Sequence, residues 1–245
     1  MRIIIGILVL IGLFSCKEDQ PNTVFIENEE LTSEQIDSIL TEFKFYYETP
    51  IVIDSTHQVL IPISTQLLQK RTVYSKDGYD ADDYPRYWNV LFYNRKTGAT
   101  RLLTEDKIRI SEINVNKNEP YDEGNRIISG KILYQIGIDD YNQDKKLNNQ
   151  DPEYLFSSET DGEGLTRISP PNEDLQYFEV IPGTKQILMR TRRDVNGDLL
   201  FDSKDETILY RAELIDQEWK VTSIINPATQ KSIENLYFEQ WLRER

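Results

Sequence analysis

The chain has 245 residues, with 28 basic and 42 acidic side chains and a formal net charge of −14. This length suits one domain or two small ones, and 38% hydrophobic with 11% aromatic residues is enough to form a buried core. The acidic balance excludes a nucleic-acid partner, because phosphate binding requires a basic surface. A single Cys and a single His exclude disulfide frameworks, Cys/His zinc sites and Cys–His nucleophile pairs.

The first residues predict an export signal. A short basic start precedes the apolar run 3–14, which is shorter than the about 20 residues that a membrane-spanning helix needs. The string Leu13-Phe14-Ser15-Cys16 resembles the lipobox of bacterial lipoproteins, in which the Cys is lipidated and becomes the mature N-terminus. The resemblance implies a signal peptide over residues 1–15, a lipid on Cys16 that binds the membrane, and a tether over residues 16–30. The alternative is a plain signal peptide or short anchor in which Cys16 is incidental.

The residues after Cys16 bear on location. Lys17 stands where an Asp commonly retains lipoproteins in the inner membrane, so an outer-membrane lipoprotein is expected. The string Lys17-Glu18-Asp19 resembles a surface-export signal of one group of Gram-negative bacteria. It favours surface display over a periplasm-facing location, and the alternative is an ordinary solvated tether.

Amphipathic patterns predict a short helix near each end of the domain that we expect over residues 31–245. Thr32 and Gln35 have capping-box spacing, and apolar residues follow at helical intervals. Near the other end, Asn226 and Pro227 can cap and start a helix over about 227–244. Its apolar face would carry Ile233, Leu236, Tyr237 and Trp241.

Between these helices the chain consists of short β-rich runs separated by turn residues, which predicts an all-β class. Residues 140–156 align without gaps to residues 194–210, and a fainter copy lies upstream. Each copy predicts an antiparallel unit of four strands whose longest loop joins the second strand to the third. The units would cover about 46–104, 105–170 and 173–225.

Two strings, LFYNRKTGATRLLT and LFSSETDGEGLTRIS, resemble the blades of TolB-type β-propellers. The resemblance implies a propeller-like array of about three units, although closed propellers generally have four or more blades. A terminal segment could complete a fourth sheet, the array could stay open and be capped by the helices, or two chains could share a ring. An unrelated antiparallel sandwich is the remaining alternative.

The repeated loops are rich in Asp and Asn. Oxygen-bearing side chains stand at positions 1, 3, 5, 9 and 12 of each copy, an order in which alternate residues can converge on one hard cation. The first copy has Asp140, Asn142, Asp144, Asn148 and Asp151, and the second has Asp194, Asn196, Asp198, Asp202 and Asp205.

This order resembles the calcium loop of EF-hands and, more closely, that of dockerins, and implies two calcium sites. Two features depart from it: position 6, usually Gly, is Lys145 or Leu199, and the expected flanks are strands. The alternative is a solvated loop rich in Asx turns.

Catalysis has little support in the sequence. His57 lies near Asp54 and Ser55 in a segment that predicts a hairpin turn. Residues that are neighbours in one turn do not have the geometry of a catalytic triad. We therefore expect no catalytic residue and a calcium-stabilised interaction module of the cell envelope, with an envelope protein or a glycan as partner. A carboxylate-dependent hydrolase, or an accessory subunit of an envelope secretion or uptake complex, is the alternative.

Overall fold

The computed structural model describes residues 32–33, 45–53, 56–65, 87–115 and 130–243. The predicted signal peptide, Cys16, the tether and all but two residues of the predicted N-terminal helix lie outside these ranges. The chain divides into a unit of residues 1–40 and a unit of residues 41–245. The structure described below belongs to the second unit.

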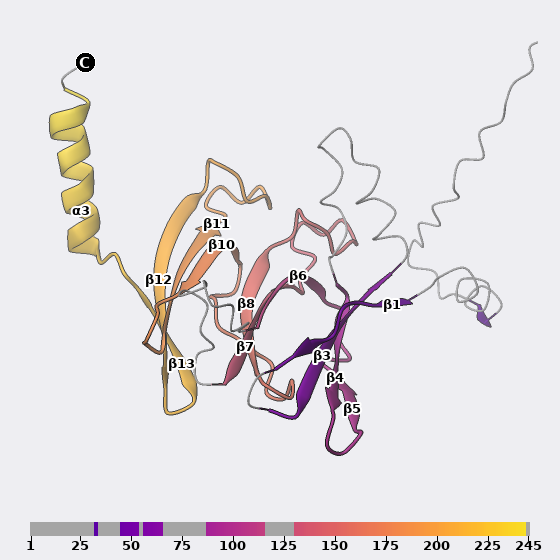
Figure 1. The fold of residues 1–245 in the computed structure, drawn as a ribbon. Coiled ribbons are helices and arrows are strands. Elements are labelled where there is room, and N and C mark those ends of the chain that lie inside the picture. The colour runs from indigo at the N-terminus through magenta and orange to yellow at the C-terminus, as the bar shows by residue number, and fades with distance from the viewer. Residues whose placement is uncertain (1–31, 34–44, 54–55, 66–86, 116–129, 244–245) are drawn as a thin grey trace, which may run out of the picture. The chain divides into compact units, whose positions relative to one another are not determined.

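Three antiparallel sheets of four or five strands follow one another along the chain (Figure 1). The all-β class is therefore confirmed. The first sheet holds β1 (Phe45–Tyr47), β2 (Ile51–Val52), β3 (Gln58–Thr65), β4 (Asn89–Asn94) and β5 (Thr100–Leu102). The second sheet holds β6 (Arg109–Asn114), β7 (Lys131–Gly137), β8 (Glu153–Glu159) and β9 (Thr166–Arg167). The third sheet holds β10 (Glu173–Val180), β11 (Gln186–Arg193), β12 (Glu206–Ile215) and β13 (Glu218–Ser223).

Side-chain burial differs between the sheets because their faces are covered differently. Buried and accessible positions alternate along β11 in the third sheet, as expected for a strand with one covered face. Almost every position of β7 in the second sheet is buried. A strand that is apolar and buried on both sides must lie between two layers.

Two hydrophobic clusters hold the sheets together. The first cluster joins the first sheet to the second, and its largest members include Phe92, Tyr134 and Tyr154. The second cluster joins the second sheet to the third through Leu133, Leu155 and the inner side of β11. Successive residues of β7 thus point into opposite cores, because side chains alternate across a strand. No hydrophobic cluster of the described residues joins the first sheet to the third.

A buried polar group also joins the second and third sheets. Arg109 forms an ion pair with Glu153 at 2.8 Å, and both side chains are largely buried. The backbone N–H of Glu153 donates to the Asp174 carboxylate in β10 at 2.9 Å. Burial raises the pKa of Asp174 to about 6, against the opposing effect of this hydrogen bond.

The predicted C-terminal helix is present as α3 (Pro227–Leu236), which continues as the π-helical turn η1 (Tyr237–Trp241). The Asn226 side chain caps it by accepting from the Thr229 backbone N–H at 2.9 Å. No side chain of either element is buried. In the part of the chain that the structure describes, no helix has the length and apolar character needed to cross a membrane.

Gly162, in the turn between β8 and β9 of the second sheet, lies against Phe92 of the first sheet. Its φ of +82° is a conformation that favours glycine, and a Cβ there would lie 2.4 Å from the Phe92 ring. Gly164, two residues on, has a φ of +63° but open space around its Cα. An Ala substitution at Gly164 therefore introduces backbone strain alone, whereas one at Gly162 introduces backbone strain and a steric clash.

We predict that Gly162→Ala destabilises the fold more than Gly164→Ala does. Gly164→Ala should cost about 1 kcal/mol of backbone strain. Gly162→Ala adds overpacking against Phe92, worth about 1–3 kcal/mol more. Urea unfolding of the two variants and the wild type measures both values. Equal losses would contradict the close approach of the turn to Phe92.

Candidate metal-binding loops

The predicted ligands lie in two loops at equivalent places in neighbouring sheets. The first loop, residues 140–151, joins β7 to β8, and the second loop, residues 194–205, joins β11 to β12. Each therefore connects the second strand of its sheet to the third. Every predicted ligand falls within these two loops.

The backbone turns in the same way in both loops. At position 6, Lys145 has a φ of +66° and Leu199 a φ of +63°. At position 4, Gln143 and Gly197 also have positive φ values. The left-handed turn that glycine usually provides at position 6 is thus formed by two residues with side chains, at an energetic cost. The absence of Gly at this position does not prevent the turn.

The carboxylate at position 1 of each loop accepts hydrogen bonds from backbone N–H groups of the turn. Asp140 accepts from the backbone N–H groups of Asp144 at 3.0 Å and Lys145 at 2.8 Å. Asp194 accepts from Gly197 at 2.7 Å and from Leu199 at 3.0 Å. In both loops the N–H of position 6 is therefore bound by the carboxylate of position 1.

The remaining positions repeat one hydrogen-bond pattern. The side-chain oxygens of positions 3, 5 and 9 each accept from the backbone N–H two residues further on. The last carboxylate closes the loop, because Asp151 accepts from Tyr141 and Asn148, and Asp205 accepts from Val195 and Asp202. The repeat seen in the sequence is thus also a repeat of local structure.

The two loops differ in the environment of their carboxylates. Asp151 is almost fully buried, and burial raises its pKa against the lowering effect of its backbone hydrogen bonds. The pKa of the exposed Asp202 is lowered, first by the backbone N–H of Lys204 and then by the Lys204 side chain.

Lys204, at position 11 of the second loop, lies between two predicted ligands. Its ammonium group is 3.1 Å from the Asp202 carboxylate and 3.8 Å from the Asp198 carboxylate. The first loop has the neutral Gln150 at this position, whose side chain accepts from Asn142 at 3.3 Å. The second loop has one carboxylate more than the first, and its lysine is paired with two of the predicted ligands.

The carboxylates of each loop are bound to backbone N–H groups and do not converge on one point. Within the described ranges, no three His, Cys, Asp or Glu side chains are grouped closely enough to hold a metal ion. A metal would need the side chains to turn toward a common centre. Each carboxylate oxygen has lone pairs beyond those already used, so the donor chemistry still suits a hard cation.

The loops also contact each other. The Tyr141 ring of the first loop packs on the Phe201 ring of the second, with centroids 4.9 Å apart. Its hydroxyl donates to the Asp194 carboxylate at 3.4 Å. Burial, followed by the charge of Asp194, raises the pKa of Tyr141. The contact between the loops could not be predicted from the spacing of the ligands, because the contact depends on how neighbouring sheets stack.

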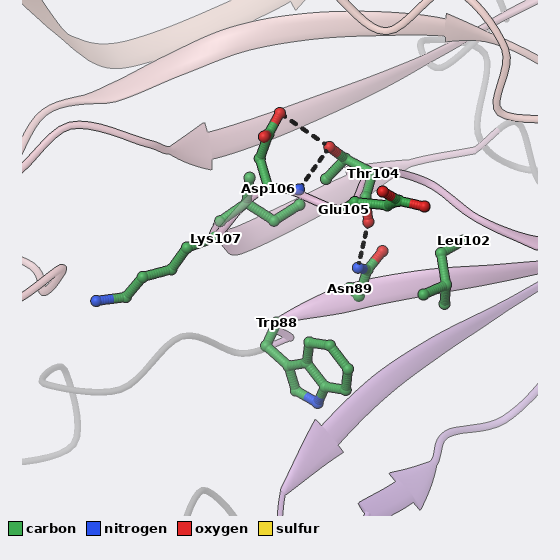
Figure 2. Close-up of a pocket in the computed structure, with 8 residues that line it drawn as sticks. Trp88, Asn89, Leu102, Thr104, Glu105, Asp106 and Lys107 are labelled. Atoms are coloured by element: carbon green, nitrogen blue, oxygen red, sulfur yellow. Dashed lines mark hydrogen bonds between the residues drawn. The ribbon is translucent and has the colours of Figure 1, made fainter. Parts of the chain in front are cut away.

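A separate pocket of about 430 Å³ lies at the first sheet, lined by Trp88, Asn89, Leu102 and the turn that follows β5 (Figure 2). Asn89 donates to the Thr104 carbonyl at 2.8 Å, and Thr104 and Asp106 bind each other across the turn. The charged residues Glu105, Asp106 and Lys107 also line the pocket.

Comparison of the chain with protein-family models, with curated proteins and with solved structures finds no match.

Proposed function

We propose that this protein is a lipid-anchored, non-catalytic interaction module of the bacterial outer membrane, in which calcium stabilises a β-repeat domain. The observation that carries the proposal is the shared structure of the two acidic loops. Both loops have the left-handed turn at position 6, and both bind its N–H with the carboxylate of position 1. Two loops with the same donor order and the same local structure favour a common ligand over solvated turns.

The donor set of each loop suits calcium. Asp140, Asn142, Asp144, Asn148 and Asp151 would hold the ion in the first loop, and Asp194, Asn196, Asp198, Asp202 and Asp205 in the second. Calcium prefers carboxylate and amide oxygens and accepts irregular ligand shells. A divalent cation would neutralise the repulsion between the carboxylates of each loop. Outside the cytoplasm, weak sites with dissociation constants of about 10⁻⁴–10⁻³ M are useful, because calcium is abundant there.

Calcium in these loops would stabilise the stacking of sheets as well as each loop. An ordered first loop fixes Tyr141, which contacts Phe201 and Asp194 of the second loop. The first loop lies beside the buried Arg109–Glu153 ion pair, since Glu153 follows Asp151 by two residues. Metal binding would therefore strengthen the junction between the second and third sheets.

We also propose that the three sheets are the units of an open, propeller-like array. Each is an antiparallel sheet with its strands mostly in chain order, and each pair of neighbours shares a hydrophobic core. This is how blades pack in a β-propeller. Such a domain offers loops and sheet faces to an envelope protein or a glycan, and requires no catalytic group.

The location proposed for the domain rests on the sequence of the N-terminal segment. The lipobox at Cys16 supports attachment to a membrane through a lipid. The residues that follow support the outer membrane and display at the cell surface.

We predict that millimolar calcium raises the melting temperature of the protein relative to a chelator. Binding to the folded state stabilises it by about 2.7 kcal/mol per site at a hundredfold excess over the dissociation constant. Replacing Asp140, Asp144, Asp194 and Asp198 by Ala should abolish the shift. Thermal unfolding followed by circular dichroism measures it.

The matched control is Glu105→Ala/Glu218→Ala, which removes two exposed carboxylates outside the loops. This variant should respond to calcium as the wild type does. If the wild type does not respond to calcium, or if the loop variant responds equally, the loops are solvated turns that do not bind calcium.

We predict that Lys204→Gln increases the calcium affinity of the second loop by several-fold. The substitution removes an ammonium group that competes for Asp198 and Asp202, and it introduces the residue type of position 11 in the first loop. Isothermal titration of a variant that keeps only the second loop measures the affinity. Lys220→Gln, an exposed charge change on β13, is the control. An unchanged affinity in Lys204→Gln would show that the lysine does not compete with the ion.

We predict that Cys16→Ser releases the protein from membranes or leaves it unprocessed, because the lipid acceptor is lost. Membrane fractionation and mass spectrometry measure the two effects. A variant that stays with the outer membrane at the mature mass would refute lipid anchoring at Cys16. Protease treatment of intact cells expressing the wild type separates surface display from a periplasm-facing location.

A further inference from the structure

The first sheet has a second face, which points away from the second sheet. Strand register and the core membership of Leu60, Val90 and Phe92 define it as the opposite side. Among the strand positions whose side chains the structure describes, this outer face carries no charged residue. It consists of Phe45, Tyr47, Val52, Val59, Ile61, Ile63, Asn89, Leu91, Tyr93, Thr100 and Leu102.

Such a face is unusual for a sheet in contact with water. Phe45, Tyr47, Val52, Tyr93 and Leu102 are exposed, whereas Ile63 and Asn89 on the same face are buried. A contiguous apolar patch without charges marks an interaction surface, whereas scattered exposed apolar residues do not. The outer face of the third sheet differs, because Arg190 and Arg211 stand among its apolar residues.

The pocket of Figure 2 adjoins this outer face, since Asn89 and Leu102 line both, and its other side is formed by the charged turn residues Glu105, Asp106 and Lys107. Trp88 lies beside it and packs on Phe45, with ring centroids 5.6 Å apart. The Trp88 indole N–H is buried and has no hydrogen-bond acceptor among the described residues. A buried donor without an acceptor is costly, so the pocket is suited to a partner that supplies both apolar surface and an acceptor.

The same chain carries a second uncovered apolar surface, on the C-terminal helix (α3 and η1, yellow in Figure 1). Its apolar side chains are all exposed, and Trp241 is 73% exposed. Leu242 N–H donates to the Tyr237 carbonyl at 3.1 Å, the π-helical bond that ends the helix. The apolar helix surface consists of Ile233, Leu236, Tyr237, Phe238, Trp241 and Leu242.

The helix does not pack on the outer face of the first sheet of its own chain, because no side chain of α3 or η1 is buried. It follows β13 of the third sheet after residues 224–226, which span about 11 Å at most when fully extended. The outer face lies beyond two stacked sheets, a distance of about 20 Å or more. A contact between two copies avoids this separation.

We propose that the protein forms a dimer by reciprocal exchange, in which the C-terminal helix of each copy packs on the outer face of the first sheet of the other. A helix laid on an apolar sheet face is a stable layer arrangement. The reciprocal contact closes under twofold symmetry and leaves neither surface free. Trp241 is the most exposed residue of the helix surface.

Charge and area both fit this assignment. Lys231 and Arg243 balance Glu234 and Glu239 on the helix, so the docked segment is neutral in a chain with a net charge of −14. The six apolar side chains, each about half exposed and largely aromatic, offer on the order of 500 Å². Each copy contributes one helix and one sheet face, about 1,000 Å² in all, against about 800 Å² per partner for a stable interface.

The test measures the mass of the full-length protein in mild detergent by size-exclusion chromatography with light scattering. The wild type should have the mass of two copies, with and without chelator, because the exchange does not depend on calcium. Phe238→Ala/Trp241→Ala on the helix and Leu102→Glu on the sheet should each weaken association by about tenfold or more. Leu188→Glu, at a residue 37% exposed on the third sheet compared with 39% for Leu102, is the matched control and should stay dimeric.

Mixing the two disrupted variants under different affinity tags distinguishes exchange from other dimers. Each mixed pair retains one intact contact, from the wild-type helix of the Leu102→Glu copy to the wild-type sheet of the other copy. Recovery of mixed pairs in a pull-down supports the exchange.

A dimer that survives Leu102→Glu but not the helix variant would show helix-to-helix pairing and overturn the proposal. A monomeric wild type would do so as well, since the two surfaces would then be covered in another way. Circular dichroism melting of every variant shows that each remains folded.

Discussion

The burial of β7 on both faces is the constraint on which the rest of the domain depends. Ile132, Tyr134 and Ile136 enter the core shared with the first sheet, and Leu133 enters the core shared with the third. One strand thus supplies side chains to two separate cores. A slip of one residue in its pairing would exchange the two sets and disrupt both cores together, so the register of the second sheet is strongly determined.

Each acidic loop joins the sheet, at one of its ends, through a residue in a charged pair. The first loop leads into Glu153, which pairs with the buried Arg109. The second loop follows Arg193, whose guanidinium donates to Glu173 at 2.6 Å. Glu173 is buried and also accepts from Thr191. The loops are therefore attached to rigid strand ends, which explains why two loops with different sequences keep the same turn.

The sequence was sufficient for the parts of the structure that depend on local pattern. Short β-rich runs separated by turn residues predicted the antiparallel sheets, and Asn226 with Pro227 predicted the start of α3. The ligand spacing also identified two loops that prove alike in structure. The left-handed turn at position 6 does not require glycine. Hydrogen bonds to Asp140 and Asp194 hold Lys145 and Leu199 in the left-handed region.

Features that depend on contacts between distant residues were not predictable from one sequence. Arg109 and Glu153 are far apart in the chain, and nothing in their neighbours marks them as a buried pair. The contact of Tyr141 with Phe201 needs the second and third sheets to be stacked with their loops on the same edge. The pocket beside Trp88 likewise combines a strand with a turn that follows a different strand.

The linear order of the cores has a consequence for how the domain opens. Among the described residues, each hydrophobic cluster joins one pair of neighbouring sheets, so the stability of the domain is approximately a sum of sheet terms and two interface terms, as in solenoid proteins. The outer sheets can each unfold with the loss of one interface, whereas the second sheet can unfold alone only with the loss of both. Amide hydrogens of β7 are therefore the slowest to exchange with solvent, and partial opening starts at the two ends of the array.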